Sequence, residues 1–363
     1  MFKIADCKGK TTDAIANLHW QNLERKKIKF SMGTLPYELD SLVRRLENVI
    51  AECPSGQATY FTDLKRNDYE LLKQTIIGKP GELTILATSF RRKVANRTYP
   101  PIRYRSDNTH RKLFGDYLKY VFNYDHFIDK GSFWNAYELA SLLGVDVCIY
   151  CNRNYTYTVI RKRNYTVRPE FDHFLSTADY PFLALSFYNL IPSCHICNSN
   201  LKHDHPFTLA AYLHPYIYSL HDSVKFTVEF DNKRSYSAFD IKRFYGVMFF
   251  TGKVDNFRIK LVRRNRYVSN TQFRKAINNI RVFHLEELYN CHKDVVTEMI
   301  LNAIIYNEDK IDELFKTYGG VLFSSREDVV RHITKNFPGE TDLLKRPFSK
   351  LSKDIHVEFG LKY

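Results

Sequence analysis

The sequence contains no uninterrupted apolar run of the roughly 20 residues that a membrane span requires. Its first residues, MFKIADCKGKTTDAIANLHW, also lack the long apolar stretch of a secretory signal. We therefore expect a cytoplasmic protein without a membrane partner, whose thiols stay reduced. No repeat period or low-complexity tract stands out along the 363 residues, and this length predicts a compact module with flanking regions.

Acidic residues are in deficit. The chain has 40 Asp and Glu against 54 Lys and Arg, which gives a net charge of +14 and a pI near 9.3. Such an excess favours a polyanionic partner through counterion release, although it also occurs on proteins that merely stay soluble. Because no membrane span accompanies this charge, we expect nucleic acid as the partner, ahead of a membrane surface.

The apolar pattern predicts an α+β fold in three parts, which are a helical accessory region at 1–140, a central module at 141–216 and a mixed strand and helix region at 217–363. Helical spacing of apolar residues occurs at 39–50, 118–122, 135–144, 271–318, 325–336 and 349–358. The alternation of half-buried strands occurs at 224–230 and 257–262. The central module is predicted to contain short strands and turns. It is also rich in Cys, His, Asp and Asn residues.

Four of the seven cysteines form two C-x-x-C pairs, Cys148-Ile-Tyr-Cys151 and Cys194-His-Ile-Cys197. Each pair can present two thiolates to one tetrahedral ion, so together they predict a closed structural zinc site. The 42 residues between the pairs exceed the gap in a compact zinc ribbon, so something folded must lie inside it. The alternatives are four buried thiols without metal, or a redox dithiol. A redox dithiol needs only one pair, so it explains the presence of two pairs less well than a zinc site does.

The insert between the two pairs and the residues directly after it contain Asp172-His173, Asn189-Leu190 and, following the second cysteine pair, Asn198. With these motifs, the segment from Cys148 to Lys202 resembles an HNH endonuclease of the ββα-metal type. That family's pattern is an Asp-His pair, an Asn-Leu further along, and a C-x-x-C followed by His or Asn. The sequence meets each element in order, with Asp172-His173, Asn189-Leu190, Cys194-x-x-Cys197 and Asn198. The resemblance implies a ββα-metal core with a structural zinc site, and nuclease activity.

Phosphodiester cleavage requires an activated water and positive charge near phosphorus. Asp172 and His173 are neighbours on a predicted strand, so their side chains diverge, and one can bind metal while the other faces the nucleophile. His173, with an ordinary pKa of about 6.5, can accept a proton from water. Asp172 and the amide oxygen of Asn198 suit Mg²⁺ or Mn²⁺. The resemblance further implies that Asn189 braces the hairpin loop and orients His173, and that Lys202 neutralises a phosphate.

Two positions depart from the family pattern. The proline that often follows Asp-His is absent, since Phe174-Leu-Ser occupies that stretch, which affects loop shape rather than chemistry. Asn198 replaces the final His of the pattern. This replacement is common among HNH nucleases that pair it with Asp-His, and it favours Mg²⁺ over a His-rich catalytic zinc site.

The cysteine spacing, the Asp-His and Asn-Leu motifs and the tail 346–354 are also similar to HNH effectors of bacterial anti-phage systems, of which the Septu-type nuclease is the nearest. This second resemblance implies an ATPase partner and a role in killing phage or host. It also implies that the substrate can be RNA, including tRNA, as well as DNA.

Other polar residues have simpler interpretations. Asp125-His126 repeats the Asp-His pair without a following cysteine pair, so we expect it on a helix surface. His195 is expected to be exposed rather than a ligand. His203-Asp204-His205 could reach the metal or a phosphate, or form a solvated turn, and Glu170 shares a strand face with Asp172 and could support the metal site.

Four basic runs are candidate contacts with a nucleic-acid backbone. Arg161-Lys162-Arg163 lies within the insert near the predicted catalytic strand, so we expect it to contact phosphate. The other three are each more typical of a solvated face, and they are 25–27, 91–93 and Arg263-Arg-Asn-Arg266.

The sequence thus predicts an HNH endonuclease that uses structural zinc and catalytic Mg²⁺ or Mn²⁺, with DNA favoured as substrate. One alternative is a zinc-stabilised nucleic-acid-binding module without catalysis. Another is a restriction endonuclease that reads methylated or specific DNA through residues 1–140.

Overall fold

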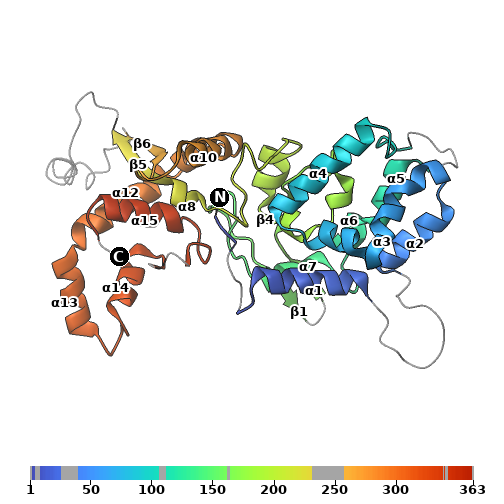
Figure 1. Cartoon of the computed structure of the whole chain (residues 1–363). Helices are drawn as coiled ribbons and strands as arrows, with labels where there is room; N and C mark the ends of the chain where they lie inside the picture. The colour runs from blue at the N-terminus through green and yellow to red at the C-terminus, as the bar shows by residue number, and fades with distance from the viewer. Residues whose placement is uncertain are drawn as a thin grey trace. The chain divides into compact units, whose positions relative to one another are not determined.

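The computed structural model describes residues 2–4, 9–25, 40–105, 112–161, 164–230, 257–337, 339 and 342–361. Within these ranges the fold is mixed α/β, as predicted, with many helices and three two-stranded sheets (Figure 1). None of the described helices has both the length and the apolar character that crossing a membrane requires.

Contacts group the chain into two units. The N-terminal unit contains Ile4–Val145 and Thr156–Ile217, and the C-terminal unit contains Met1–Lys3, Asp146–Tyr155 and Tyr218–Tyr363. The three-part division that the sequence suggests stays a prediction.

Helices dominate the first part of the N-terminal unit. They are α1 Thr12–Glu24, α2 Leu42–Glu52, α3 Ser55–Ile77, α4 Pro80–Ala95, α5 Phe114–Val121, α6 Tyr124–Ile128 and α7 Ala136–Leu143. The predicted helices near 39–50, 118–122 and 135–144 correspond to α2, α5 and α7 and are confirmed. In α7, Asn135 caps the first turn by accepting the N–H groups of Tyr137 and Glu138, and Gly144 ends the helix at a φ of 57°.

An aromatic core joins these helices to the insert between the cysteine pairs. Phe182, in the short helix η1 Pro181–Leu183, lies 4.5 Å from Phe90 between ring centroids, and Tyr60 lies 5.1 Å from Phe90. All three rings are buried. Each such ring buries roughly 150–250 Å², so the helices provide a rigid support for the segment that follows Phe182.

The insert forms two hairpins, and a short helix follows it. Strand β1 Val159–Arg161 pairs with β2 Asn164–Val167, and β3 Glu170–His173 pairs with β4 Leu190–Ser193, both antiparallel. The π-helix η3 Ile196–Lys202 follows β4 and packs on β3. The order along the chain from β3 is therefore strand, strand, helix.

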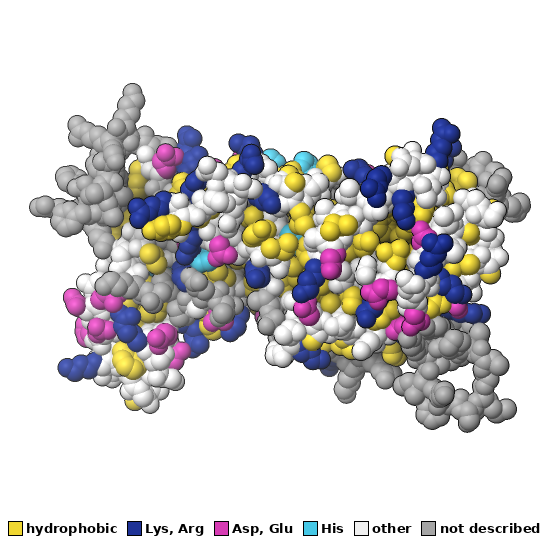
Figure 2. Space-filling view, viewed as in Figure 1, with side chains coloured by type: hydrophobic (Ala, Val, Ile, Leu, Met, Phe, Trp, Pro, Cys, Tyr) yellow, Lys and Arg dark blue, Asp and Glu magenta, His cyan; other side chains and the backbone are white. Residues whose placement is uncertain are grey.

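In its described residues, the C-terminal unit contains one hairpin and a group of helices. After α8 Leu220–Ser223, strands β5 Val224–Phe230 and β6 Phe257–Arg263 pair along their full length and alternate buried with exposed side chains, as predicted. The helices are α10 Asn270–Val282, α11 Leu285–Asn290, α12 Lys293–Ile305, α13 Glu308–Tyr318, α14 Arg326–Thr334 and α15 Ser349–Glu358. They confirm the helical segments predicted after residue 271. Lys and Arg side chains lie over the region of β6 and α10 (Figure 2).

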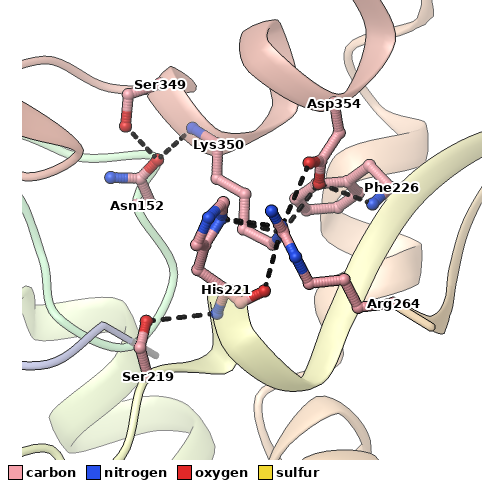
Figure 3. Close-up of polar contacts among 8 residues, drawn as sticks. All are labelled: Asn152, Ser219, His221, Phe226, Arg264, Ser349, Lys350 and Asp354. Carbon is pink, nitrogen blue, oxygen red and sulfur yellow. Dashed lines mark hydrogen bonds and ion pairs between the residues drawn. The ribbon is translucent and has the colours of Figure 1, made fainter. Parts of the chain in front are cut away.

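Asn152, directly after the first cysteine pair, is anchored by residues far along the chain. It is fully buried with a φ of 54°, and its amide donates to the Leu343 carbonyl at 2.8 Å. Its Oδ1 accepts from the Ser349 hydroxyl at 3.0 Å and from the Lys350 N–H at 3.3 Å (Figure 3). The segment 343–350 thus fixes the chain at the end of this pair.

Candidate functional site

The two cysteine pairs come together, as predicted. The sulfur atoms of all four side chains lie within 4.8 Å of one another. Four thiolates around a tetrahedral zinc ion lie about 3.8 Å apart for a Zn–S bond of about 2.3 Å, so the cluster fits such an ion after a small contraction. Burial of the four side chains also suits a closed structural site. They are Cys148, Cys151, Cys194 and Cys197.

The second pair connects the hairpin to η3. Strand β4 ends at Ser193, directly before Cys194, and the N–H of Asn198 donates to the Cys194 carbonyl at 3.0 Å. Cys197 and Asn198 both lie in η3. A metal held by this pair would therefore also fix where Asn198 lies.

A cavity of about 390 Å³ is formed by residues of α6, β3 and η3 and of the loops beside them. This volume lies within the roughly 300–1,000 Å³ of typical ligand sites. The structure brings Asp172, His173, Asn198 and Lys202 to the wall of this cavity, where the sequence predicted a common site.

His173 is half-buried and held in one orientation. Its Nε2 lies 3.0 Å from the Ala184 carbonyl, which can only accept, so Nε2 carries the proton and Nδ1 keeps a lone pair. The ring of Tyr124 packs against it edge-on, with centroids 4.7 Å apart. Burial lowers the pKa of His173 from its ordinary value. A neutral imidazole held in this way can accept a proton at Nδ1.

Residues 184–186, which include the carbonyl that accepts from His173, are themselves fixed by side chains from other elements. Buried His19 donates from Nε2 to the Leu185 carbonyl at 2.9 Å and accepts the Trp134 N–H at 2.9 Å, and burial lowers the pKa of His19 to about 4. Ser186 donates to the Thr75 carbonyl of α3. The acceptor for His173 therefore belongs to a rigid stretch of chain.

Asn189 closes the loop between β3 and η1. Its side chain is 1% exposed, and its Oδ1 accepts the Leu175 N–H at 2.7 Å. Its amide donates to the carbonyls of Leu175 at 3.1 Å and Leu183 at 3.2 Å. These bonds brace the loop. The bond to Leu183 also holds the residue directly before Ala184, whose carbonyl accepts from His173.

Lys202 makes contacts that differ from the predicted phosphate contact. Its ammonium lies 2.8 Å from Asp172 Oδ1 and 2.8 Å from the His173 carbonyl, and the side chains of Lys202 and Asp172 are only 2% and 4% exposed. Because η3 packs on β3, the last residue of the helix reaches under the strand instead of toward solvent. Lys202 thus compensates the charge of Asp172.

Glu170 has a larger part in the site than its sequence position suggested. Its carboxylate accepts from His195 at 2.7 Å, from the Asn198 amide at 2.9 Å and from Ser199 at 3.0 Å. Partial burial alone would raise the Glu170 pKa, but these hydrogen bonds together lower it below its ordinary value. The carboxylates of Glu170 and Asp172 and the amide oxygen of Asn198 are hard donors that fit Mg²⁺ or Mn²⁺.

The other residues predicted to contact phosphate or metal are exposed or lie outside the described residues. Arg161 is exposed at the end of β1, while Lys162 and Arg163 lie outside the described residues. His203 and Asp204 are exposed at the cavity and pair at 3.0 Å. Sequence analysis missed Tyr124, and no spacing signal connects that residue to β3.

No protein-family model, curated protein or solved structure matches the chain. The function proposed below therefore depends on the motif and on the geometry of this cavity.

Proposed function

We propose that the chain is a metal-dependent endonuclease of the HNH class that hydrolyses phosphodiester bonds in nucleic acid, with DNA favoured. The observation that carries this proposal is the arrangement of His173, with Nδ1 able to accept a proton, beside Asp172 and Asn198 in one cavity. The excess of positive charge and the strand, strand, helix order also support it.

In the proposed reaction, Nδ1 of His173 takes a proton from water while the water oxygen bonds to phosphorus. The P–O bond to the leaving oxygen breaks, and that oxygen takes a proton from solvent water. The Ala184 carbonyl keeps the opposite nitrogen protonated and fixes the ring. Asp172 and Asn198, with Glu170 as a third oxygen donor, would hold Mg²⁺ or Mn²⁺. Such an ion, when bound, supplies positive charge to the phosphate oxygens.

The cysteine cluster has a structural role in this proposal. The four cysteines would hold zinc, and the helix that begins beside Cys194 would carry Asn198 to the cavity. The anti-phage role, the ATPase partner and the possibility of an RNA or tRNA substrate are proposals that rest on the resemblance of the motifs.

The test is to incubate the purified chain, alone and with the product of its neighbouring gene, with labelled DNA and total RNA, with and without Mg²⁺ or Mn²⁺, and to sequence the ends. We expect cuts that require the metal and are lost in His173→Ala. Binding without cleavage under every condition would favour the non-catalytic module. Cuts confined to one DNA sequence or to methylated sites would favour the restriction enzyme.

A further inference from the structure

The segment from β6 through α10 is basic without any acidic residue. Residues 257–285 contain eight Lys and Arg and neither Asp nor Glu. In a chain with 40 acidic residues, a stretch of this length with none concentrates positive charge on one part of the C-terminal unit. Figure 2 shows dark-blue Lys and Arg side chains in the region of β6 and α10.

Some of these cations are compensated within the fold. Arg264 turns inward, where its guanidinium donates to the His221 carbonyl at 3.2 Å and lies 3.9 Å from Asp354 (Figure 3). Lys260 lies 3.7 Å from Glu286. Arg264 and Lys260 therefore stabilise the fold, because each faces a carboxylate of the same unit.

Four arginines have no carboxylate partner among the described residues. Arg263 packs its guanidinium 4.5 Å over the Phe273 ring and donates to Asn270 at 2.8 Å, so it is held in place while its charge stays uncompensated. Arg266, Arg274 and Arg281 are exposed. Arg274 and Arg281 are two turns apart on one face of α10, roughly 10 Å along its axis at about 1.5 Å per residue. The arginines therefore continue from the loop after β6 along the helix.

An exposed aromatic ring lies in the same loop. Tyr267 is 79% exposed, although its N–H bonds to Asn265 at 2.9 Å and its hydroxyl accepts from Arg266 at 2.9 Å. The Arg266 guanidinium also lies 5.0 Å over the Tyr267 ring. A large aromatic side chain held open to solvent beside uncompensated arginines combines the two features that unpaired nucleic acid binds, namely a stacking face and charge along the backbone.

We propose that Arg263, Arg266, Tyr267, Arg274 and Arg281 form a binding surface for single-stranded nucleic acid on the C-terminal unit. The arginines contact phosphates, and Tyr267 stacks on an unpaired base. A duplex hides its base faces and would leave Tyr267 unused. This surface is separate from the residues of the cavity, and its binding does not depend on cleavage.

The experiment measures fluorescence anisotropy of the full-length chain with labelled single-stranded DNA, single-stranded RNA and duplex DNA, over a series of salt concentrations and without added Mg²⁺ or Mn²⁺. The triple variant Arg263→Gln, Arg266→Gln, Arg274→Gln should lower the slope of log K against log salt by about 2, at about 0.7 per phosphate contact on single strands. Tyr267→Ala should weaken single-strand binding by about 5- to 150-fold and leave duplex binding unchanged.

The controls remove two exposed cations and one exposed tyrosine from α13 and α14. Lys310→Gln with Arg331→Gln takes away exposed cations that already face carboxylates, and Tyr318→Ala removes an exposed tyrosine. Both should bind single strands like the wild type, and all variants should keep its melting temperature. Unchanged binding in the triple variant and in Tyr267→Ala would overturn the proposal. So would binding of anionic phosphatidylserine vesicles in place of oligonucleotides. Because no cleavage is scored, an inactive His173→Ala leaves this result unaffected.

Discussion

Two Asp-His dipeptides of the N-terminal unit have opposite surroundings. Asp125 in α6 is exposed and pairs with Lys119 at 3.2 Å, where both side chains are more than 60% exposed. Asp172 in β3 is buried and pairs with equally buried Lys202. His126 lies 3.2 Å from the hydroxyl of nearby Ser132, whereas His173 reaches the Ala184 carbonyl across the loop.

The difference lies in the backbone that carries each dipeptide. On a strand, neighbouring side chains point to opposite faces, so Asp172 and His173 can meet different partners across the hairpin. On the short helix α6, Asp125 is exposed and His126 is half-buried, and neither faces the β3 hairpin in the way that Asp172 and His173 do. The dipeptide alone therefore carries little information about function, and its surroundings carry most of it.

The largest expected effect comes from removing the cysteine cluster. A cysteine pair directly follows the hairpin that carries Asp172-His173, and none directly follows the helix that carries Asp125-His126. Structural zinc contributes about 10–16 kcal/mol of apparent binding free energy in zinc-finger peptides. Cys194→Ser should therefore lose the bound zinc, lower the melting temperature and abolish cleavage. Elemental analysis and calorimetry measure this, with exposed Cys291→Ser as the control. Unchanged zinc content and stability in Cys194→Ser would show that the cluster holds no structural metal.

The comparison is tested most directly at the two histidines. His173→Ala removes the proposed proton acceptor and should reduce the cleavage rate by about 10² to 10⁴, with zinc content, circular dichroism and substrate binding retained. His126→Ala should cut at the wild-type rate. A folded His173→Ala with near wild-type cleavage would refute the assignment of the base, and an inactive His126→Ala would move the site to α6.

The two aspartates should differ in their effect on stability. Asp172→Ala leaves the Lys202 ammonium buried without its partner, which should cost about 3–5 kcal/mol in the free energy of unfolding. It should also weaken the dependence of cleavage on Mg²⁺. Asp125→Ala breaks an exposed pair worth about 1 kcal/mol or less. Urea denaturation compares them, and the double variant Asp172→Ala, Lys202→Met should recover part of the loss. Equal effects at the two positions would contradict the difference in burial.

The smallest effect concerns Tyr124, the residue of α6 that does contact β3. Its hydroxyl donates to the Phe171 carbonyl at 3.2 Å, so Tyr124→Phe should cost about 0.5–1.5 kcal/mol while the ring against His173 remains. Exposed Tyr120→Phe is the control and should change stability less. A larger loss in Tyr120→Phe would show that α6 does not support the hairpin through Tyr124.

Local signals explain what the sequence could predict. Asn135 and Gly144 mark the ends of α7 because capping depends only on neighbouring residues, and the alternation at 224–230 and 257–262 marks two half-buried strands. The four cysteines were predicted to meet because one ion needs four ligands. Asp172 and His173 were also predicted on a strand, and β3 contains them.

Long-range contacts explain what the sequence could not predict. The burial of Lys202 against Asp172 depends on how η3 packs on β3, which no spacing encodes. Tyr124 meets His173 only because α6 lies beside the hairpin. The hydrogen bonds of Glu170 with His195 and Ser199 likewise follow from the angle between strand and helix. Such pairs become visible only once the tertiary fold is known.

The anchoring of Asn152 has a consequence for the time at which the chain can fold. Its partners Leu343, Ser349 and Lys350 lie 191, 197 and 198 residues further along. At a synthesis rate of about 5–20 residues per second, a ribosome needs roughly 10–40 s to make the intervening chain. Until then, the Asn152 side chain cannot form these hydrogen bonds. If the chain is a nuclease, this part of each copy takes its final form only after residue 350 has been made.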